Sequence, residues 1–314
     1  MRPNEELTFV NKADMQVSDL TAGGYLEPAQ MKQFIKIAIA GTAAMQAVYV
    51  TTMTTPQQEI SKMTTMGRVM WPGVESQALP QAQRSKPGFS KVTLTTLEGV
   101  AEAHIPRAAL EDQIERGTFQ GSVSSYMGEH VRADLEDLLI NGNTASGSDA
   151  WLKLMNGMLA QATTYVVPCS QVSLSKAVLR NMLDTIPEQF ADQPGLVFWT
   201  NRKARADYRS TIGDRQTGLG DGVITGSTSK ELGYDDIPIY RIPRFPRALG
   251  VASNETNVLL HDPKNRIFAF QRQMTVDSEW RPSQRVYALI MSMRLAQAYQ
   301  HEPMVVKATQ VLGQ

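Results

Sequence analysis

Two serine–lysine pairs are the residues in this sequence whose types and spacing come nearest to a catalytic site. Ser173 lies three residues before Lys176, and Ser227 lies three residues before Lys230. A lysine at this spacing can take the proton of a serine hydroxyl and prepare the oxygen for acyl transfer. The serine enzymes with this arrangement also carry Ser-Asp-Asn and Lys-Thr-Gly elements, and neither occurs here. A serine hydrolase is therefore kept only as a distant alternative.

A glycine-rich segment, GDRQTGLGDG at residues 213–222, has the composition of a loop that could approach a phosphate or a cation. Glycines let backbone N–H groups come close to an anion. However, no Gly-Lys-Ser or Gly-Lys-Thr closes the segment, as a nucleotide-binding loop requires, and Asp214 and Asp221 lack the spacing of a calcium loop. We expect a flexible loop without a ligand.

Metal and acid–base chemistry lack the residue spacing that they need. The single cysteine, Cys169, excludes a cysteine-rich zinc site and an intramolecular disulfide, and it fits a reducing compartment. The histidines do not have metal-binding spacing; they are His104, His130, His261 and His301. Adjacent acidic residues are expected beside turns or on a solvated helix face: Glu111-Asp112, Glu136-Asp137 and Asp235-Asp236. We predict no catalytic residue, no metal and no cofactor, so the chain is not expected to be an enzyme.

Overall charge and hydrophobicity narrow the classes of protein further. The 31 basic and 31 acidic residues cancel at pH 7, so the basic excess of a dedicated nucleic-acid-binding protein is absent. An apolar content of 42% is ordinary for a folded globular chain. The polar N-terminus does not have the form of a signal peptide, and no apolar run is long enough to span a bilayer. We therefore expect no membrane role.

The elements that must position any site begin with a helix over residues 119–141. Its apolar residues recur at steps of three and four, the period of one buried helix face: Phe119, Val123, Tyr126, Met127, Val131, Leu135, Leu138 and Leu139. The opposite, solvated face is expected to carry Glu129, Arg132, Asp134, Glu136 and Asp137. The Asn-Gly-Asn sequence at residues 141–143 is expected to end the helix because these residues tolerate a left-handed conformation.

A long β-hairpin is predicted over residues 48–98. Two threonine-rich arms, at residues 48–55 and 91–97, flank a polar stretch that is rich in proline and glycine. An isolated two-stranded ribbon is at best marginally stable in water, so the hairpin needs a surface to lie against. Trp71 either anchors the hairpin to a neighbouring molecule, since buried aromatic residues dominate interface energies, or folds back onto its own domain.

In the C-terminal half, Ser175 is expected to cap a helix, and Asn201 to cap another after a buried strand at residues 195–200. Arg241, Arg244 and Arg247 stand three residues apart with prolines between them. In a polyproline II segment their guanidinium groups would line one edge at intervals of about 9 Å. That edge could meet carboxylates of a neighbouring subunit or phosphates, or it could remain a solvated loop.

The order of these motifs resembles the major capsid proteins of tailed double-stranded DNA phages, which have the Hong Kong ninety-seven capsid fold. The motifs are Gly23-Gly24-Tyr25-Leu26-Glu27-Pro28, the extended segment closed by Ile105-Pro106, the Leu110-Glu111-Asp112 helix, the long helix that ends in Asn-Gly-Asn, and the strand Val197-Phe198-Trp199-Thr200 before Asn201. Each motif alone is degenerate, and the specificity comes from their order over nearly the whole chain.

The resemblance implies an α+β fold with five parts. These are an N-terminal arm and short helix at 1–47, an extended hairpin loop at 48–98, and a peripheral domain at 99–170 whose spine helix, at about 119–141, packs on an antiparallel sheet. An axial α/β domain at 171–256 and the closing strands of the peripheral domain at 257–314 complete the fold.

The resemblance also implies a function and a set of partners. The chain would assemble into pentamers and hexamers of an icosahedral shell around a phage genome, in the cytoplasm of the host bacterium, and remain in the virion. Its partners would be itself, a separate scaffolding protein, a portal, a decoration protein and DNA held by weak non-specific contacts. The alternative is the shell protein of an encapsulin compartment. The candidate subunit-interface residues are Trp71, Arg84, Lys86, Arg241, Arg244, Arg247, Trp280 and Arg281.

Some members of this family join subunits through a hairpin lysine and an asparagine near the closing strands. Lys62, Lys86 and Lys91 are available in the predicted hairpin, but the segment from Ser278 to Arg294 contains no asparagine. We therefore expect no cross-link of this type.

Overall fold

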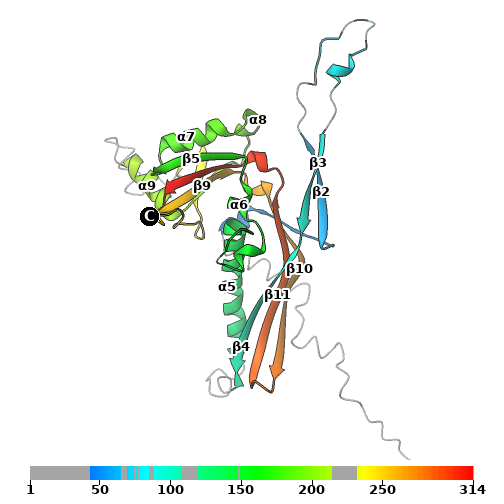
Figure 1. Ribbon diagram of the computed structural model, residues 1–314, viewed down its shortest axis with the longest axis vertical. Helices are drawn as coiled ribbons and strands as arrows, with labels where there is room; N and C mark the ends of the chain where they lie inside the picture. The colour runs from blue at the N-terminus through cyan, green and yellow to red at the C-terminus, as the bar shows by residue number, and fades with distance from the viewer. Residues whose placement is uncertain are drawn as a thin grey trace, which may run out of the picture.

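The computed structural model describes residues 43–64, 69–73, 75, 78–84, 88–107, 119–147, 149–213 and 232–313 (Figure 1). The described chain is a mixed α+β structure with two larger β-sheets, a separate two-stranded hairpin, and helices packed on the sheets. Residues 1–42 of the predicted N-terminal arm and short helix, the short helix at 110–112, and the glycine-rich segment from Asp214 onward lie outside the described residues.

The first sheet has four strands in the order β1, β10, β11, β4. Their bounds are Tyr49–Thr52 for β1, Arg266–Arg281 for β10, Val286–Tyr299 for β11 and Leu97–Pro106 for β4. β10 and β11 form a long antiparallel pair, β4 pairs antiparallel with β11, and β1 lies parallel to the start of β10. Figure 1 shows β4, β10 and β11 extending together with helix α5 beside them; we call these three strands the blade.

Helix α5 runs from Phe119 to Asn141, the residues predicted from the sequence. Its side chains at Val131, Leu135 and Leu139 are buried in one core with Met291 and Met293 of β11. Because side chains alternate along a strand, every second residue of β11 faces this core. The apolar stripe of α5 thus covers one face of the blade.

Two residues of α5 lie where the helical period did not predict them. Tyr126 was expected to be buried but is 63% exposed, whereas Glu136 was expected on the solvated face but is 3% exposed. The short helix α3, Ala43–Ala47, supplies Ala44 and Met45 to the same core, which also buries Ile140. Because α3 adds a second covered side near the end of α5, the buried sector there is wider than one stripe.

The end of α5 occurs at the predicted residues but for a different reason. Gly142 is not among the described residues with a positive φ, so the expected left-handed stop is wrong. A Cβ atom on Gly142 would lie 2.3 Å from the backbone oxygen of Met155, and Gly157 N–H donates to the Gly142 carbonyl oxygen at 2.7 Å. The helix ends where the chain needs glycine for this close approach.

The second sheet has six strands in the order β5, β12, β9, β6, β8, β7. Their bounds are Tyr165–Val172 for β5, Val306–Leu312 for β12, Glu255–His261 for β9, Val197–Thr200 for β6, Ile237–Arg241 for β8 and Gly233–Tyr234 for β7. Successive residues of β6 point into two different cores. Phe198 packs in the core of this sheet, and Trp199 packs in the core that α5 shares with the blade. The two sheets are therefore joined by one strand with both faces buried.

Three helices belong to the second sheet: α7 Lys176–Thr185, α8 Glu188–Ala191 and α9 Arg202–Gly213. Asn201 caps α9 as predicted, because its side-chain oxygen accepts the Ala204 N–H at 2.8 Å. Ser175 occupies the predicted cap position of α7, but its side chain makes no capping hydrogen bond. The shorter segments α6 Met158–Gln161, η1 Gln81–Gln83, η2 Leu152–Leu154, η3 Pro263–Asn265 and η4 Glu302–Met304 lie between the larger elements.

The strands predicted at 257–314 do not all return to the sheet beside α5. β10 and β11 do, but β9 and β12 pair with each other in the six-stranded sheet, where Val306 lies opposite Leu260. The side chains of Val306, Ala308 and Val311 are fully buried there. Apolar alternation identifies such strands but does not identify the sheet that they join, so the expected change of domain at residue 257 is wrong.

The predicted hairpin is present, but its first arm is displaced along the sequence. The arms are β2 Gln57–Thr64 and β3 Gly88–Thr95, which pair antiparallel along their full length. The segment at 48–55 was predicted to be the first arm, and instead it contributes β1 to the four-stranded sheet. A threonine-rich pattern suits either position, since β-propensity does not specify the partner strand.

The burial of Leu135 generates the first prediction. Leu135→Asp places a carboxylate at a position that is 1% exposed, which should lower the free energy of unfolding by more than about 3 kcal/mol. Circular dichroism during urea denaturation measures the loss, and the control Glu129→Ala, at an exposed position of the same helix, should change it by less than about 0.5 kcal/mol. Equal stability of Leu135→Asp and the wild type would contradict the described packing.

Candidate assembly interface

The inward face of the β2–β3 hairpin fixes its base to the four-stranded sheet. Leu94, which is 1% exposed, and the half-buried Ile60 pack against Met53, Ile267 and Ala296. Beyond this contact the hairpin extends away from the sheets (Figure 1). The described subunit therefore covers the base of the hairpin and leaves most of its outward face to solvent.

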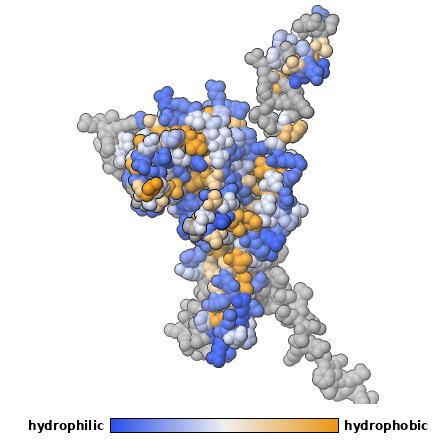
Figure 2. Space-filling model, viewed as in Figure 1, coloured by the Kyte–Doolittle hydropathy of each residue, from blue (hydrophilic) through white to orange (hydrophobic). Residues whose placement is uncertain are grey.

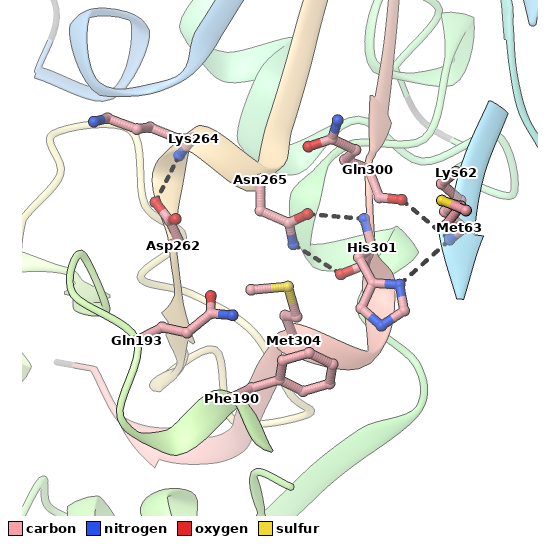
Figure 3. Close-up of a pocket in the computed structure, with 10 residues that line it drawn as sticks. All are labelled: Lys62, Met63, Phe190, Gln193, Asp262, Lys264, Asn265, Gln300, His301 and Met304. Carbon is pink, nitrogen blue, oxygen red and sulfur yellow. Dashed lines mark hydrogen bonds between the residues drawn. The ribbon is translucent and has the colours of Figure 1, made fainter. Parts of the chain in front are cut away.

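A second attachment lies beside a cavity of about 380 Å³. The Lys62 ammonium donates to the Gln300 carbonyl oxygen at 3.1 Å and lies 3.5 Å from His301 Nδ1 (Figure 3). Asn265 holds the backbone of His301 from the other side, because its amide donates to the His301 carbonyl oxygen and its oxygen accepts the His301 N–H, both at 2.8 Å. Lys62 thus connects the hairpin to the chain between β11 and β12.

The outward face of the hairpin carries an uncovered apolar pair. Met63 and Phe89 lie directly opposite each other on β2 and β3, and they are 67% and 69% exposed. Further along the same face, Lys91 forms an ion pair with Glu59 at 2.6 Å. In Figure 2, apolar residues on the visible surface occur in separate patches between hydrophilic ones. A flanking ion pair beside exposed apolar side chains is the composition of a protein interface with a polar rim.

Of the interface candidates predicted in the hairpin, two lie within the described residues. Trp71 is 38% exposed, and its neighbour Met70 is 86% exposed. Arg84 is exposed, and its Nε donates to the Leu79 carbonyl oxygen at 3.1 Å, so it stabilises its own loop. Lys86 lies outside the described residues.

The blade face opposite α5 is covered by paired charges. Glu98 of β4 bonds Arg272 of β10 and lies 3.6 Å from Arg294 of β11. Nearer the blade's end, Glu102 lies 2.8 Å from both His104 and Arg281. Hydrogen bonding from His104, and then the charge of Arg281, hold the pKa of the Glu102 carboxyl below its ordinary value although partial burial opposes them.

The candidates Trp280 and Arg281 make contacts within their own subunit. The Trp280 ring lies 4.5 Å from the Tyr287 ring, and the Arg107 guanidinium lies 5.9 Å from the Trp280 ring centre. Arg281 pairs with Glu279 at 3.1 Å as well as with Glu102. Both residues therefore stabilise the blade's end, and any contact with a neighbour would have to share these groups.

The arginines at 241, 244 and 247 do not lie on a polyproline II segment. Arg241 ends β8, and the chain then turns, with the Phe245 N–H donating to the Ile242 carbonyl oxygen at 3.2 Å. Ile242 and Phe245 are both 2% exposed, so the apolar residues between the arginines pull this segment into the core. The prediction of one evenly spaced edge is wrong. The three arginines themselves are exposed.

Glu136 is a buried acid that sequence reasoning placed in solvent. One of its carboxylate oxygens has no hydrogen-bond partner among the described residues. Burial raises the pKa of the carboxyl; the backbone of Ala44 and the charge of Arg244 oppose the rise, and Asp137 adds to it. The raised pKa means that ionisation of Glu136 at neutral pH weakens the folded state.

Arg266 and His261, also missed from the sequence, are fully buried between the two sheets. Arg266 donates to Gln161 Oε1 at 2.7 Å and lies 4.7 Å from the Tyr299 ring centre. Burial lowers the pKa of Arg266 to about 10 although the Tyr299 hydroxyl opposes the shift. Burial also lowers the pKa of His261 to about 3, with Arg266 acting in the same direction and the backbone of Asp262 opposing. The imidazole is therefore neutral near pH 7 and packs edge-on against Trp199 at 4.5 Å.

Of the two serine–lysine pairs considered for catalysis, one lies within the described residues. Ser173 and Lys176 are both exposed where the chain enters α7, and the pair at 227 and 230 lies outside the described residues. Within the described part of the chain, no three His, Cys, Asp or Glu side chains are grouped to hold a metal ion. None of the described helices has the length and hydrophobicity that are needed to span a bilayer.

Comparison with known proteins gives similarity over nearly the whole chain. No family model matches the sequence. The chain is 29% identical over 313 residues to the "Putative prophage capsid protein YqbE" of Bacillus subtilis (strain 168), covering 98% of this chain and 99% of that one. The satellite phage P4 procapsid structure, which includes the size determination protein, aligns with a TM-score of 0.66 at 14% identity, covering 94% of this chain and 95% of that one. The SrpI encapsulin complex of Synechococcus elongatus PCC 7942 aligns with a TM-score of 0.54 at 10% identity, covering 95% and 96%.

The fold defines the class: a mixed α+β chain with the fold seen in a phage procapsid and in an encapsulin complex. Within that class, the resemblance to the major capsid proteins of tailed phages, predicted from the sequence, is confirmed by the prophage relative and the phage capsid structures. The structural likenesses alone do not separate a phage capsid from an encapsulin, because both types align over nearly the whole chain.

The burial of Glu136 generates the second prediction. Because its pKa is raised in the folded state, the stability that it contributes is fully present below its unfolded pKa and is lost as the pH rises through the folded one. Glu136→Gln cannot ionise, so the variant should be more stable than the wild type at pH 7.5, and the difference should narrow toward pH 4.5. Urea denaturation at several pH values measures the difference. Asp192→Asn, which removes a carboxylate at an exposed position, serves as the control and should change the free energy of unfolding by less than about 0.5 kcal/mol.

Proposed function

We propose that this chain is the major capsid subunit of a tailed double-stranded DNA phage, which assembles into pentamers and hexamers of an icosahedral shell. The observation that carries the proposal is the hairpin, whose apolar pair Met63 and Phe89 is left uncovered by the described subunit. The prophage relative, aligned from end to end, supports the same role. A neighbouring subunit supplies the missing surface.

The energetics of such a shell follow from the geometry of the hairpin. A two-stranded ribbon is marginal in water by itself, and burying an exposed large apolar side chain contributes about 1.5–3 kcal/mol. Contacts of this size are weak enough singly to correct an error in assembly, while several contacts per subunit reinforce one another. We expect interfaces above about 2,000 Å² when summed over all neighbours.

The remaining expectations follow from the same proposal. The partners are other copies of the chain, a separate scaffolding protein, a portal, a decoration protein, and packaged DNA through weak non-specific contacts. Assembly takes place in the cytoplasm of the host bacterium, and the protein remains in the virion. It has no catalytic activity and takes no cofactor.

An encapsulin shell is the second candidate, and the alignment with the SrpI complex favours it. Electron microscopy of the purified protein tests both candidates, because each requires closed shells. Extraction of the shells then separates them: double-stranded DNA supports the phage capsid, and an enclosed protein supports the compartment. A protein that remains a monomer under assembly conditions contradicts both.

The third prediction concerns the exposed side chains of the hairpin. Phe89→Ser and Trp71→Ala remove apolar side chains that are 69% and 38% exposed. Phe89→Ser should keep the wild-type unfolding free energy within about 0.5 kcal/mol, and Trp71→Ala should leave the subunit folded. In both variants the yield of shells should fall at least about ten-fold. Sedimentation and electron microscopy measure the yield. Thr93→Ser, on the same face of β3, is the matched control. Normal assembly of both variants would contradict the proposal that the hairpin contacts a neighbouring subunit.

The fourth prediction is that mature shells contain no lysine–asparagine cross-links between subunits. The segment from Ser278 to Arg294 has no asparagine, and two of the hairpin lysines are engaged within the subunit: Lys62 with Gln300, and Lys91 with Glu59. Shells boiled in detergent should run as a single band at the subunit mass of 34.7 kDa. A ladder of covalent oligomers would contradict this prediction.

A further inference from the structure

The attachment of Lys62 to the body is unusual because one of its neighbours can itself become a cation. The Lys62 ammonium has three N–H donors; one donates to the Gln300 carbonyl oxygen at 3.1 Å, and the nitrogen lies 3.5 Å from His301 Nδ1. Figure 3 shows both contacts reaching across from β2 to the chain around His301. A neutral imidazole can present a lone pair at Nδ1 to the ammonium, whereas a protonated imidazole carries an N–H on both nitrogens.

A protonated His301 would face the Lys62 ammonium as a second cation, and the other charges around His301 do not neutralise that repulsion. Lys62 faces it from β2, and Glu302 adjoins it in η4; Asp262 and Lys264 line the same cavity from the end of β9 and from η3. The Glu302 carboxylate is already used, because its Oε1 accepts the N–H groups of Thr163 and Thr164, each at 2.8 Å. It therefore remains in place whether or not His301 is charged.

The pKa of His301 lies below its ordinary value of 6.5, chiefly because of burial and then because of the charge of Lys62, with Glu302 opposing. Linkage makes the effect of Lys62 reciprocal. If the Lys62 contact disfavours a proton on His301, then a proton on His301 must weaken the Lys62 contact by the same free energy.

We propose that Lys62 and His301 form a proton-controlled latch that holds the end of the β2–β3 ladder farther from β1 and β4 against the body of its own subunit. The latch is closed when His301 is neutral. A proton on His301 places two cations within 3.5 Å, which opens the contact while Leu94 and Ile60 still attach the hairpin through their apolar packing. This inference concerns the isolated subunit and does not rest on the proposed function.

The direction of the pH effect follows from the two states of the latch. In the open state His301 is more exposed and farther from Lys62, so it binds a proton more readily than in the closed state. The balance therefore shifts toward the open state as the pH falls below about 6.5, the ordinary pKa of histidine. Two unit charges about 4 Å apart repel each other enough, even in water, to change an equilibrium about five-fold.

Hydrogen–deuterium exchange of the full-length chain tests the latch, read at peptides from β2 and β3 and corrected for the intrinsic dependence of exchange on pH. Between pH 7.5 and pH 5.5, exchange in the wild-type hairpin should rise about five-fold relative to β6 and β9. His301→Asn should remove this dependence on pH. The variant keeps the bonds with Asn265, because these use the backbone atoms of residue 301. Lys62→Met should exchange fast at both pH values.

The matched control is Lys91→Met, which removes a lysine from the same hairpin but from its outward face, where it pairs with Glu59. This variant should keep the wild-type response to pH. If Lys62→Met lowers the yield of folded protein, Lys62→Gln replaces it with the same expectation. A wild-type hairpin whose corrected exchange does not change with pH would overturn the latch. So would a His301→Asn variant that keeps the dependence, or a Lys62 variant that is as protected at pH 7.5 as the wild type.

Discussion

The antiparallel pairing of β10 with β11 is the interaction on which the rest of the subunit depends. The two strands contain 16 and 14 residues and are paired from Arg266–Tyr299 at one end to Arg281–Val286 at the other. One face of the pair is covered by α5, and the other carries the charge pairs formed with β4. Because successive side chains of a strand point to opposite faces, the residues of both strands must alternate between apolar side chains that face α5 and side chains that suit the face carrying the charge pairs.

The inner end of that ladder is also where the two sheets meet. Arg266 begins β10 directly after β9 and η3, and Tyr299 ends β11 directly before η4 and β12. The two residues lie opposite each other in register, and the guanidinium of Arg266 lies over the ring of Tyr299. Burying a cation without a carboxylate is costly. Here the Gln161 side chain and the Tyr299 ring compensate for the lost water, and this compensation also ties α6 to the junction.

How far the sequence predicted this structure depended on whether a feature is local. The bounds of α5 and the cap at Asn201 follow from residues within a few positions of each other, and both predictions are correct. The position of β1 and the pairing of β9 with β12 depend on partners more than 40 residues away, about which the alternation of side chains says nothing. The burial of Glu136 has the same cause, because it is created by α3 and not by the helix that carries the residue. Among the interface candidates, residue type alone could not show that Arg281 is paired within its own subunit while Phe89, which was not selected, is exposed.

The contrast between the blade and the hairpin bears on which surface assembles. Both are long β-structures that project from the rest of the subunit (Figure 1). The blade satisfies its own charges through Glu98, Glu102 and their arginines and covers its apolar face with α5, so it can be stable in a free subunit. The hairpin instead buries side chains only at its base and exposes Met63 and Phe89. A ribbon of this kind gains more from a partner than a surface whose polar and apolar groups are already paired, because its apolar area is still in water. The hairpin has also lost part of its conformational entropy through the attachments at Leu94 and Lys62, so binding a partner costs less entropy. Of these two described parts, the hairpin is therefore the one in which a neighbouring copy would recover more free energy.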